Sequence, residues 1–183
     1  MENENALVIT IRERGSEAFY RETVNVLSQY RALLKRPEKK LTDNFRMLRV
    51  YGILCDILFV LFALLAVRNG LSGGRLAALI VLFFASVLAS VSRKNLNGMA
   101  RKLVEGHSVS VLTLDAEGVE LDHKEAQAVR LAWNNVAFVR VFAESIAVLS
   151  KDGAGLVISI DRRYESEVIP WLRDNRPDIR MLS

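Results

Sequence analysis

The segment RNGLSGGR, residues 68–75, separates two long apolar runs and decides the fold of this chain. The run before it, VYGILCDILFVLFALLAV, covers residues 50–67, and the run after it, LAALIVLFFASVLASV, covers residues 76–91. An α-helix rises about 1.5 Å per residue, so crossing about 30 Å of hydrocarbon takes roughly 17 to 25 residues. The first run has 18 residues and the second has 16, which is near the short end of that range. The two runs therefore predict a transmembrane helical hairpin with its turn at residues 68–75.

The positive charges around the two runs predict the orientation of the hairpin. Eleven Lys and Arg residues flank the apolar runs within residues 31–49 and 93–102, against two in the turn, Arg68 and Arg75. By the positive-inside rule, both termini are expected in the cytoplasm, in a multi-pass protein of the cell inner membrane. Residues 1–49 are heavily charged, so no cleavable secretory signal is expected and the first span acts as its own insertion signal. The eleven flanking cations are Arg31, Lys35, Arg36, Lys39, Lys40, Arg46, Arg49, Arg93, Lys94, Arg101 and Lys102.

The basic segment RALLKRPEKK, residues 31–40, has two interpretations. Cations are expected beside any span that starts in the cytoplasm, which favours a topology determinant. The alternative is a contact with anionic lipid or nucleic acid, where each cation near an acidic leaflet contributes about 1 kcal/mol. Residues 1–102 hold 16 Lys and Arg against 8 Asp and Glu, whereas residues 103–183 hold 9 against 13. The excess of negative charge in the second part argues against nucleic-acid binding there.

The turn contains GLSGG at residues 70–74, which matches the G-x-S-x-G pattern of a hydrolase nucleophile elbow. That pattern requires a strand before the serine, a helix after it, and a base later in the chain. Both flanks of Ser72 are predicted helices, and the only histidines, His107 and His123, are expected across the membrane from it. The glycines are therefore interpreted as residues that end a helix and reverse the chain.

Residues 1–49 predict a strand and an amphipathic helix on the cytoplasmic side. ALVITI at residues 6–11 is a short β-branched run typical of a strand. Ser16 is a suitable N-cap for a helix that runs to about Leu34. Pro37 limits its continuation, and PEKKLTDN links it to the first span. The apolar face of this helix comprises Phe19, Val26, Tyr30 and Leu33.

Residues 103–183 predict a cytoplasmic antiparallel β domain, which makes the whole chain an α+β protein. Six short runs with alternation and β-branching are separated by turn residues. We expect them to form one meander sheet, to which residues 6–11 could add a seventh strand. A closing helix is predicted with Ser166 as cap, Pro170 near its first turn and a stop at residues 175–177. The six runs are SVSVLTL (108–114), VELDH (119–123), AVRLAW (128–133), VAFVRVFA (136–143), SIAVLS (145–150) and LVISI (156–160).

In this chain two spans are followed by EGHSVSVLTLDAEGVEL, by an AW dipeptide before NNVAFVRVFAESIAVLS, and by LVISIDRRY before a helix. This order of segments resembles that of the bacterial YcxB-like proteins. The resemblance covers the whole chain in layout and is closest over residues 105–170. That family has a strand with a tryptophan, which Trp133 matches here. It also has a strand that ends in an isoleucine followed by a basic pair and an aromatic residue, and residues 162–164 match the basic pair and the aromatic residue. Asp161 stands where that family commonly has proline. The resemblance implies a pleckstrin-homology-like (PH-like) domain and brings no reaction with it.

Motifs for catalysis, metals and cofactors are not found in the sequence. Cys55 is the only cysteine and lies inside a predicted span, and the two histidines have no ligand partner at a suitable spacing. The chain has no G-x-G-x-x-G after a strand and no P-loop pattern. We therefore expect no enzyme activity, no metal and no cofactor.

Asp56 is the residue of greatest interest in the predicted spans, because a carboxyl group there is costly and suggests a functional or helix-pairing role. Positions equidistant from the turn place it near Ser86 and Ser90, on a run of small residues where helices approach closely. The alternatives are an interfacial carboxyl that is wetted or protonated, and proton or ion handling. Each of the three remains open.

Two functional classes follow from the sequence. The first is a membrane-anchored, non-enzymatic interaction module that recognises a protein partner, or itself, at the inner face of the membrane. The second is a sensor of anionic lipid or of a small ligand, in which Arg162 and Arg163 contact an anionic group. The bilayer is an expected partner in both, nucleic acid in neither, and channel or transporter activity ranks third because two spans form a pathway only by oligomerising.

Overall fold

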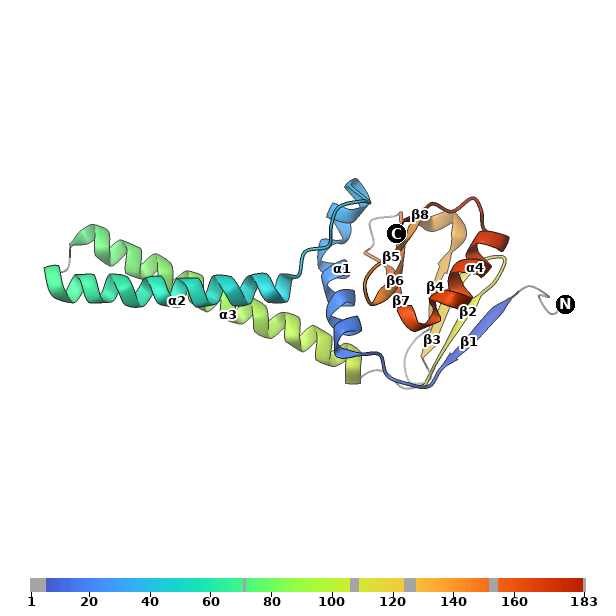
Figure 1. The fold of residues 1–183 in the computed structure, drawn as a ribbon, viewed down its shortest axis with the longest axis horizontal. Helices are drawn as coiled ribbons and strands as arrows, with labels where there is room; N and C mark the ends of the chain where they lie inside the picture. Colours follow the sequence, from blue (N-terminus) through green and yellow to red (C-terminus); the bar gives the residue numbers. More distant parts are fainter. Residues whose placement is uncertain (1–5, 71, 106–108, 124–127, 152–154, 183) are drawn as a thin grey trace. The chain divides into compact units, whose positions relative to one another are not determined.

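The computed structural model describes residues 6–70, 72–105, 109–123, 128–151 and 155–182 (Figure 1). The chain is an α+β protein that divides into two compact units. Residues 43–99 form a helical hairpin, and residues up to Thr42 combine with those from Ala100 onward into a unit of sheets and helices. The elements are β1 (Leu7–Ile11), α1 (Glu17–Lys35), α2 (Asn44–Asn69), α3 (Gly73–Glu105), β2 (Ser110–Leu114), β3 (Gly118–His123), β4 (Val129–Ala132), β5 (Val136–Val141), β6 (Ser145–Ser150), β7 (Val157–Asp161), α4 (Glu165–Asn175) and β8 (Met181–Leu182).

Local hydrogen bonds satisfy backbone groups at both ends of α2. Asp43 caps α2 by accepting hydrogen bonds from two backbone N–H groups of the first turn, at 3.1 and 3.2 Å. The helix ends at Gly70, whose φ of +76° is a conformation that favours glycine. The Arg75 guanidinium donates to the carbonyl oxygens of Asn69 and Gly70 at 2.9 and 2.6 Å, which satisfies two groups at the end of α2. The prediction that a glycine ends the first helix is confirmed.

Both hairpin helices are longer than the predicted spans. α2 has 26 residues and α3 has 33, and both are long and apolar enough to cross a bilayer. The difference arises because apolar composition marks the stretch suited to hydrocarbon, whereas backbone hydrogen bonding continues through the polar residues that follow. In α3 the segment from Ser92 to Glu105 continues the helix without a proline.

The remaining strands form two four-stranded sheets, in the orders β1-β2-β3-β4 and β7-β6-β5-β8. All six predicted strands are present, and the N-terminal strand pairs antiparallel with β2 from Leu7 opposite Leu114 to Ile11 opposite Ser110. The prediction of a single meander sheet is wrong, because no pairing joins β4 to β5. Strand β8 was not predicted; it is a two-residue strand parallel to β5, too short to show alternation.

The corner between the two sheets is built by Trp133. A 3-10 turn, Trp133–Asn135, replaces the pairing that a continuous meander would need. The Trp133 indole N–H donates to the carbonyl of Asp115 at 2.7 Å, and its backbone N–H donates to Glu117 at 3.0 Å. The corner is thus tied to the turn between β2 and β3, where a Cβ added at Gly118 would lie 2.6 Å from a carbonyl oxygen of β4.

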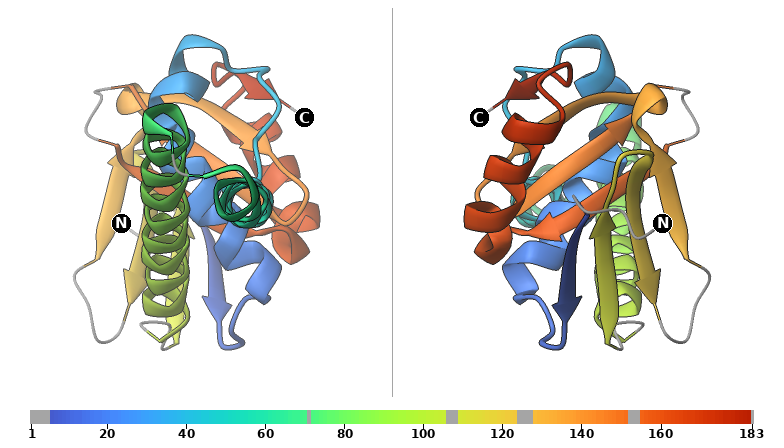
Figure 2. Two further views of the ribbon diagram at one scale, coloured as in Figure 1. Left: turned by 90° about the vertical axis from the view of Figure 1, so that its left-hand side faces the viewer. Right: turned by 90° about the vertical axis from the view of Figure 1, so that its right-hand side faces the viewer.

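The main core lies between the two sheets and α4, and a second core lies between α1 and the other face of the second sheet (Figures 1 and 2). All six residues of β6 are buried, which is expected for a strand covered on both faces. The outer face of the first sheet instead carries polar side chains such as Glu120, Asp122 and Arg130. The second core contains Val26, Tyr30 and Leu33 of α1 against Phe138, Ala147 and Leu149.

The closing helix begins earlier than predicted. Asp161 caps a 3-10 turn, Arg162–Tyr164, by accepting from the backbone N–H of Arg163 at 3.0 Å, and the turn leads directly into α4. Ser166 therefore lies inside the first turn rather than at the cap, and Pro170 lies in the helix interior. The end of α4 at Asn175 agrees with the prediction.

We predict that Tyr30→Phe destabilises the α+β unit by about 1–3 kcal/mol, because it removes a buried hydrogen-bond partner. The Tyr30 hydroxyl donates to the carbonyl of Ser150 at 2.8 Å and lies 2.9 Å from the hydroxyl of that residue. Urea unfolding of the full chain in detergent, followed by the fluorescence of Trp133 and Trp171, measures the effect on this unit, since these are the only tryptophans. The control is Tyr51→Phe, at an exposed position of α2. A change no larger than that of the control would contradict the prediction.

Candidate functional site

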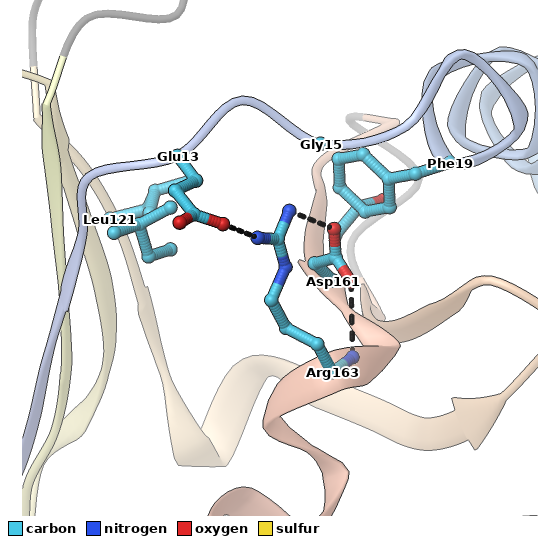
Figure 3. Close-up of a pocket in the computed structure, with 8 residues that line it drawn as sticks. Glu13, Gly15, Phe19, Leu121, Asp161 and Arg163 are labelled. Atoms are coloured by element: carbon cyan, nitrogen blue, oxygen red, sulfur yellow. Dashed lines mark hydrogen bonds and ion pairs between the residues drawn. The ribbon is translucent and has the colours of Figure 1, made fainter.

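The two arginines predicted to contact an anionic group lie at the corner where β7 passes into α4. Arg163 forms an ion pair of 2.9 Å with Asp161 and another of 2.9 Å with Glu13. It also donates to the backbone carbonyl of Arg14 at 3.0 Å, so the guanidinium joins the segment after β1 to the end of β7 (Figure 3). Arg162 pairs with Glu165 at 2.7 Å.

Carboxylates of the chain itself therefore hold both positive charges. The pKa of Arg163 is raised, first of all by its hydrogen bond to Asp161, and that of Arg162 by its hydrogen bond to Glu165. An anion that binds at Arg163 would have to compete with two carboxylates already at hydrogen-bonding distance. The geometry favours a structural role for Arg163, which links the segment after β1 to the end of β7. The side chain of Arg162 is 48% exposed.

The contacts of Arg163 depend on the close packing of the segment between β1 and α1. Figure 3 shows Gly15 beside the ring of Phe19, and a Cβ added at Gly15 would lie 2.5 Å from that ring. Ser16 caps α1 as predicted, with its hydroxyl accepting from the Phe19 N–H at 3.0 Å. The sequence thus sets the position of α1 through a small residue followed by a cap.

Asp56 contacts the second hairpin helix. The Ser86 hydroxyl donates to a carboxylate oxygen of Asp56 at 2.5 Å, whereas Ser90 is exposed. Four residues before Asp56, a Cβ added at Gly52 would lie 3.9 Å from the Cβ of Ala89, so the helix backbones are close there. The structure brings together Asp56 and Ser86 and leaves Ser90 outside the contact.

The remaining residues considered for catalysis or metal binding are Ser72 and the histidines. Ser72 is exposed, and its carbonyl accepts the first hydrogen bond of α3 from the Leu76 N–H at 3.0 Å. Among the described residues no group of three or more His, Cys, Asp or Glu side chains is placed to hold a metal ion. His107 lies outside the described residues, and so does the side chain of His123.

The basic segment is fixed against the second sheet. Arg140 of β5 donates to the carbonyls of Pro37 and Lys39 at 2.5 and 2.7 Å, and Arg180 pairs with Glu38 at 3.2 Å. Partial burial lowers the pKa of Arg140. The cations Arg31, Lys35, Arg36, Lys39 and Lys40 are all exposed.

The charge of the folded unit differs from that of its C-terminal part. Residues 1–42 and 100–183 together carry 19 Lys and Arg and 19 Asp and Glu, a net charge of zero, because the basic N-terminal segment joins the acidic strands. The distribution of charge over the surface, rather than its sum, therefore decides what this unit attracts.

One cavity in the α+β unit was not predicted. It has a volume of about 140 Å³ and is lined by residues of α1, β3, β4 and β7 and by Leu103 near the end of α3. Three residues with hydroxyl groups line it: the Tyr20 hydroxyl accepts from the Gly15 N–H at 3.1 Å, whereas the hydroxyls of Thr23 and Ser159 make no hydrogen bond within the described part of the protein. In the sequence Thr23 is one polar residue of an amphipathic helix and Ser159 one polar residue of an alternating strand, so no signal distinguished them.

Comparisons with protein-family models, with curated proteins and with solved structures gave no match to this chain.

We predict that cysteines at positions 52 and 89, introduced as Gly52→Cys and Ala89→Cys with Cys55→Ser, form an intramolecular disulfide under mild oxidation. The 3.9 Å between the two Cβ positions is close to the disulfide mean of about 3.8 Å. Non-reducing electrophoresis after proteolysis between the helices reads the result. The control pairs Gly52→Cys with Leu88→Cys, which places the second thiol at an exposed position. Equal oxidation of the two pairs would contradict the helix contact.

Proposed function

We propose that the chain is a membrane-anchored, non-enzymatic interaction module whose α+β unit recognises a protein partner at the inner face of the membrane. The observation that carries the proposal is where the exposed apolar side chains lie. Among the described residues, every large exposed hydrophobic side chain except Val8 lies between Met47 and Met99. An apolar surface of this extent is unstable in water, and a bilayer is the environment that matches its length and composition.

Strand pairing supports the proposed topology independently of charge. β1 precedes the hairpin in sequence and β2 follows it, yet the two strands pair along five residues each. Their pairing requires both ends of the hairpin to lie on the same side of the membrane that it spans. The excess of flanking cations favours the cytoplasm as that side.

We further propose that the α+β unit is a PH-like domain of the YcxB-like kind. Two packed sheets, antiparallel except for the β5–β8 pair, with a C-terminal helix in the core are compatible with that arrangement. Helix α1, which covers the outer face of the second sheet, is an addition to it. In the proposed function this domain serves recognition.

The surface best suited to a partner is the free edge of β1. Its sequence LVITI contains no charged residue and no proline, the devices that commonly protect an edge strand. The other sheet edges are less open: β4 carries Arg130, α1 packs against β7, and β8 has two residues. We infer that the partner contributes an extended segment that adds to β1, because main-chain hydrogen bonds are available there.

A second candidate function, a sensor of anionic lipid, is favoured by the five exposed cations of residues 31–40. They lie on a segment that Arg140 fixes in place, so their arrangement is preorganised. Their attraction to an acidic leaflet would weaken as salt screens it.

We predict that the full chain stays in the membrane fraction after alkaline carbonate extraction, which removes electrostatically bound proteins. In a Cys55→Ser background, a membrane-impermeant maleimide added to spheroplasts should label Ser72→Cys and not Arg173→Cys. Both thiols should react once the membrane is opened with detergent, which controls for reactivity. Extraction by carbonate, or labelling at position 173 in intact spheroplasts, would overturn the anchor or its orientation.

We predict that Val8→Lys lowers recovery of the partner by about tenfold or more, because a charge on the edge strand opposes strand addition. Val8 is 58% exposed, so the substitution leaves the core unchanged. The measurement is quantitative mass spectrometry after in-membrane cross-linking and gentle purification of the full chain. Val8→Thr is the matched control, since it keeps a β-branched side chain without the charge. A partner recovered equally with the wild type and both variants would place the contact elsewhere. Cross-linking only to further copies of this chain would identify self-association.

A further inference from the structure

The cavity beside α1 has the composition of a small-molecule site. Its walls are mostly apolar and include Phe19 and Leu27 of α1, Leu121 of β3 and Val157 of β7. Residues of α1 reach it because the helix has two adjacent apolar faces: Val26, Tyr30 and Leu33 pack on the second sheet, and the neighbouring face borders the cavity. The cavity is partly enclosed and reaches the surface.

Two buried hydroxyls that line this cavity have no internal partner. Thr23 is only 8% exposed, and the hydroxyl oxygens of Thr23 and Ser159 are both buried without a hydrogen-bond partner in the described structure. Leaving a buried hydroxyl unpaired is costly, and such groups in native proteins usually have a partner. Burial also raises the pKa of Tyr20, which lines the same cavity, in agreement with surroundings of low polarity.

We propose that this cavity binds a small uncharged amphiphile: an apolar ring or short alkyl chain that carries a hydroxyl or carbonyl group to pair with Thr23 and Ser159. The volume sets the size, because about 140 Å³ is close to the roughly 150 Å³ of an engineered cavity that holds benzene. The hydroxyls set the polar group, since each can donate and accept one hydrogen bond or more. The site does not depend on the proposed partner contact at β1, which lies on another element.

The ligand is uncharged because the cavity has no charged lining residue to pair with it. Charged residues border an adjoining pocket that shares Phe19, Leu121 and Ser159 with this cavity. There Arg163 is already paired with Asp161 and Glu13 (Figure 3). A carboxylate or ammonium ligand would therefore lose its hydration without gaining an ion pair.

The test uses the full chain in phosphatidylcholine nanodiscs and three fluorinated probes observed by ¹⁹F NMR. The probes are 4-fluorobenzyl alcohol, 4-fluorotoluene and 4-fluorobenzoate, which share a ring and differ in the polar group. We expect saturable binding of the alcohol, about tenfold weaker binding of the toluene, and no saturable binding of the benzoate. Signals from partition into lipid are removed by subtracting a Leu27→Trp variant, in which the cavity is filled.

The variant Thr23→Val with Ser159→Ala preserves the shape of the cavity and removes both hydroxyls. It should bind the alcohol about tenfold more weakly while it binds the toluene as the wild type does. Its midpoint of urea unfolding, followed by tryptophan fluorescence, should be equal or higher, because unpaired buried hydroxyls are removed. Thr10→Val, at an exposed position of β1, is the matched control and should change neither.

Three results would overturn the inference. The first is no saturable binding of either uncharged probe to the wild type. The second is equal affinity for the alcohol and the toluene, which would separate the hydroxyls from binding. The third is a loss of stability in the double variant, which would mean that the hydroxyls have internal partners. None of these results depends on whether a partner binds at β1.

Discussion

The pairing of β1 with β2 is the constraint on which the rest of the structure depends. The two strands come from opposite sides of the hairpin in sequence, and their register brings Leu7 opposite Leu114. Because α1 follows β1, the same pairing delivers the helix that covers the second sheet and the Tyr30 hydroxyl that reaches Ser150. The hairpin is thus an insertion within one folded unit. A change that frees β1 removes an edge strand, a helix and one wall of the cavity together.

This arrangement has a consequence for how the unit folds and how it can be studied. A chain that ends after Lys102 keeps β1 and α1 but loses every strand against which they pack. A fragment that starts at residue 103 loses the cover of β6, whose six residues are all buried in the whole chain. Point substitutions in the full chain are therefore the sound way to separate anchoring from recognition. The contacts between the segments before and after the hairpin are also long-range in sequence, which slows folding in comparison with local contacts.

The sequence allowed most elements to be predicted, because their signals are local. The Ser16 cap, the helix end at Gly70 and the alternation of the strands each depend on a few neighbouring residues. The division into two sheets escaped prediction because Trp133 makes its corner through hydrogen bonds to a turn many residues away. The proximity of Asp56 and Ser86 could be predicted from the sequence, because an antiparallel hairpin fixes which positions face each other. The cavity could not be predicted, because Thr23 and Ser159 are far apart in the sequence and come together only in the folded protein.

The two arginines after β7 show how structure changes the meaning of a motif. In the sequence, Arg162 and Arg163 at a strand end are candidates for contact with an anionic group, because guanidinium groups pair well with anions, although arginines in this position are usually solvated. In the folded chain Asp161 takes part in both the cap of the turn and the ion pair with Arg163, so the charge is neutralised where it arises. The exposed cations that could attract an acidic surface are instead those of residues 31–40, which the sequence marks as flanking charge of the first span. A polar or charged residue is informative about ligands only after its internal partners are known, and by that criterion the unpaired hydroxyls of the cavity outrank the paired arginines.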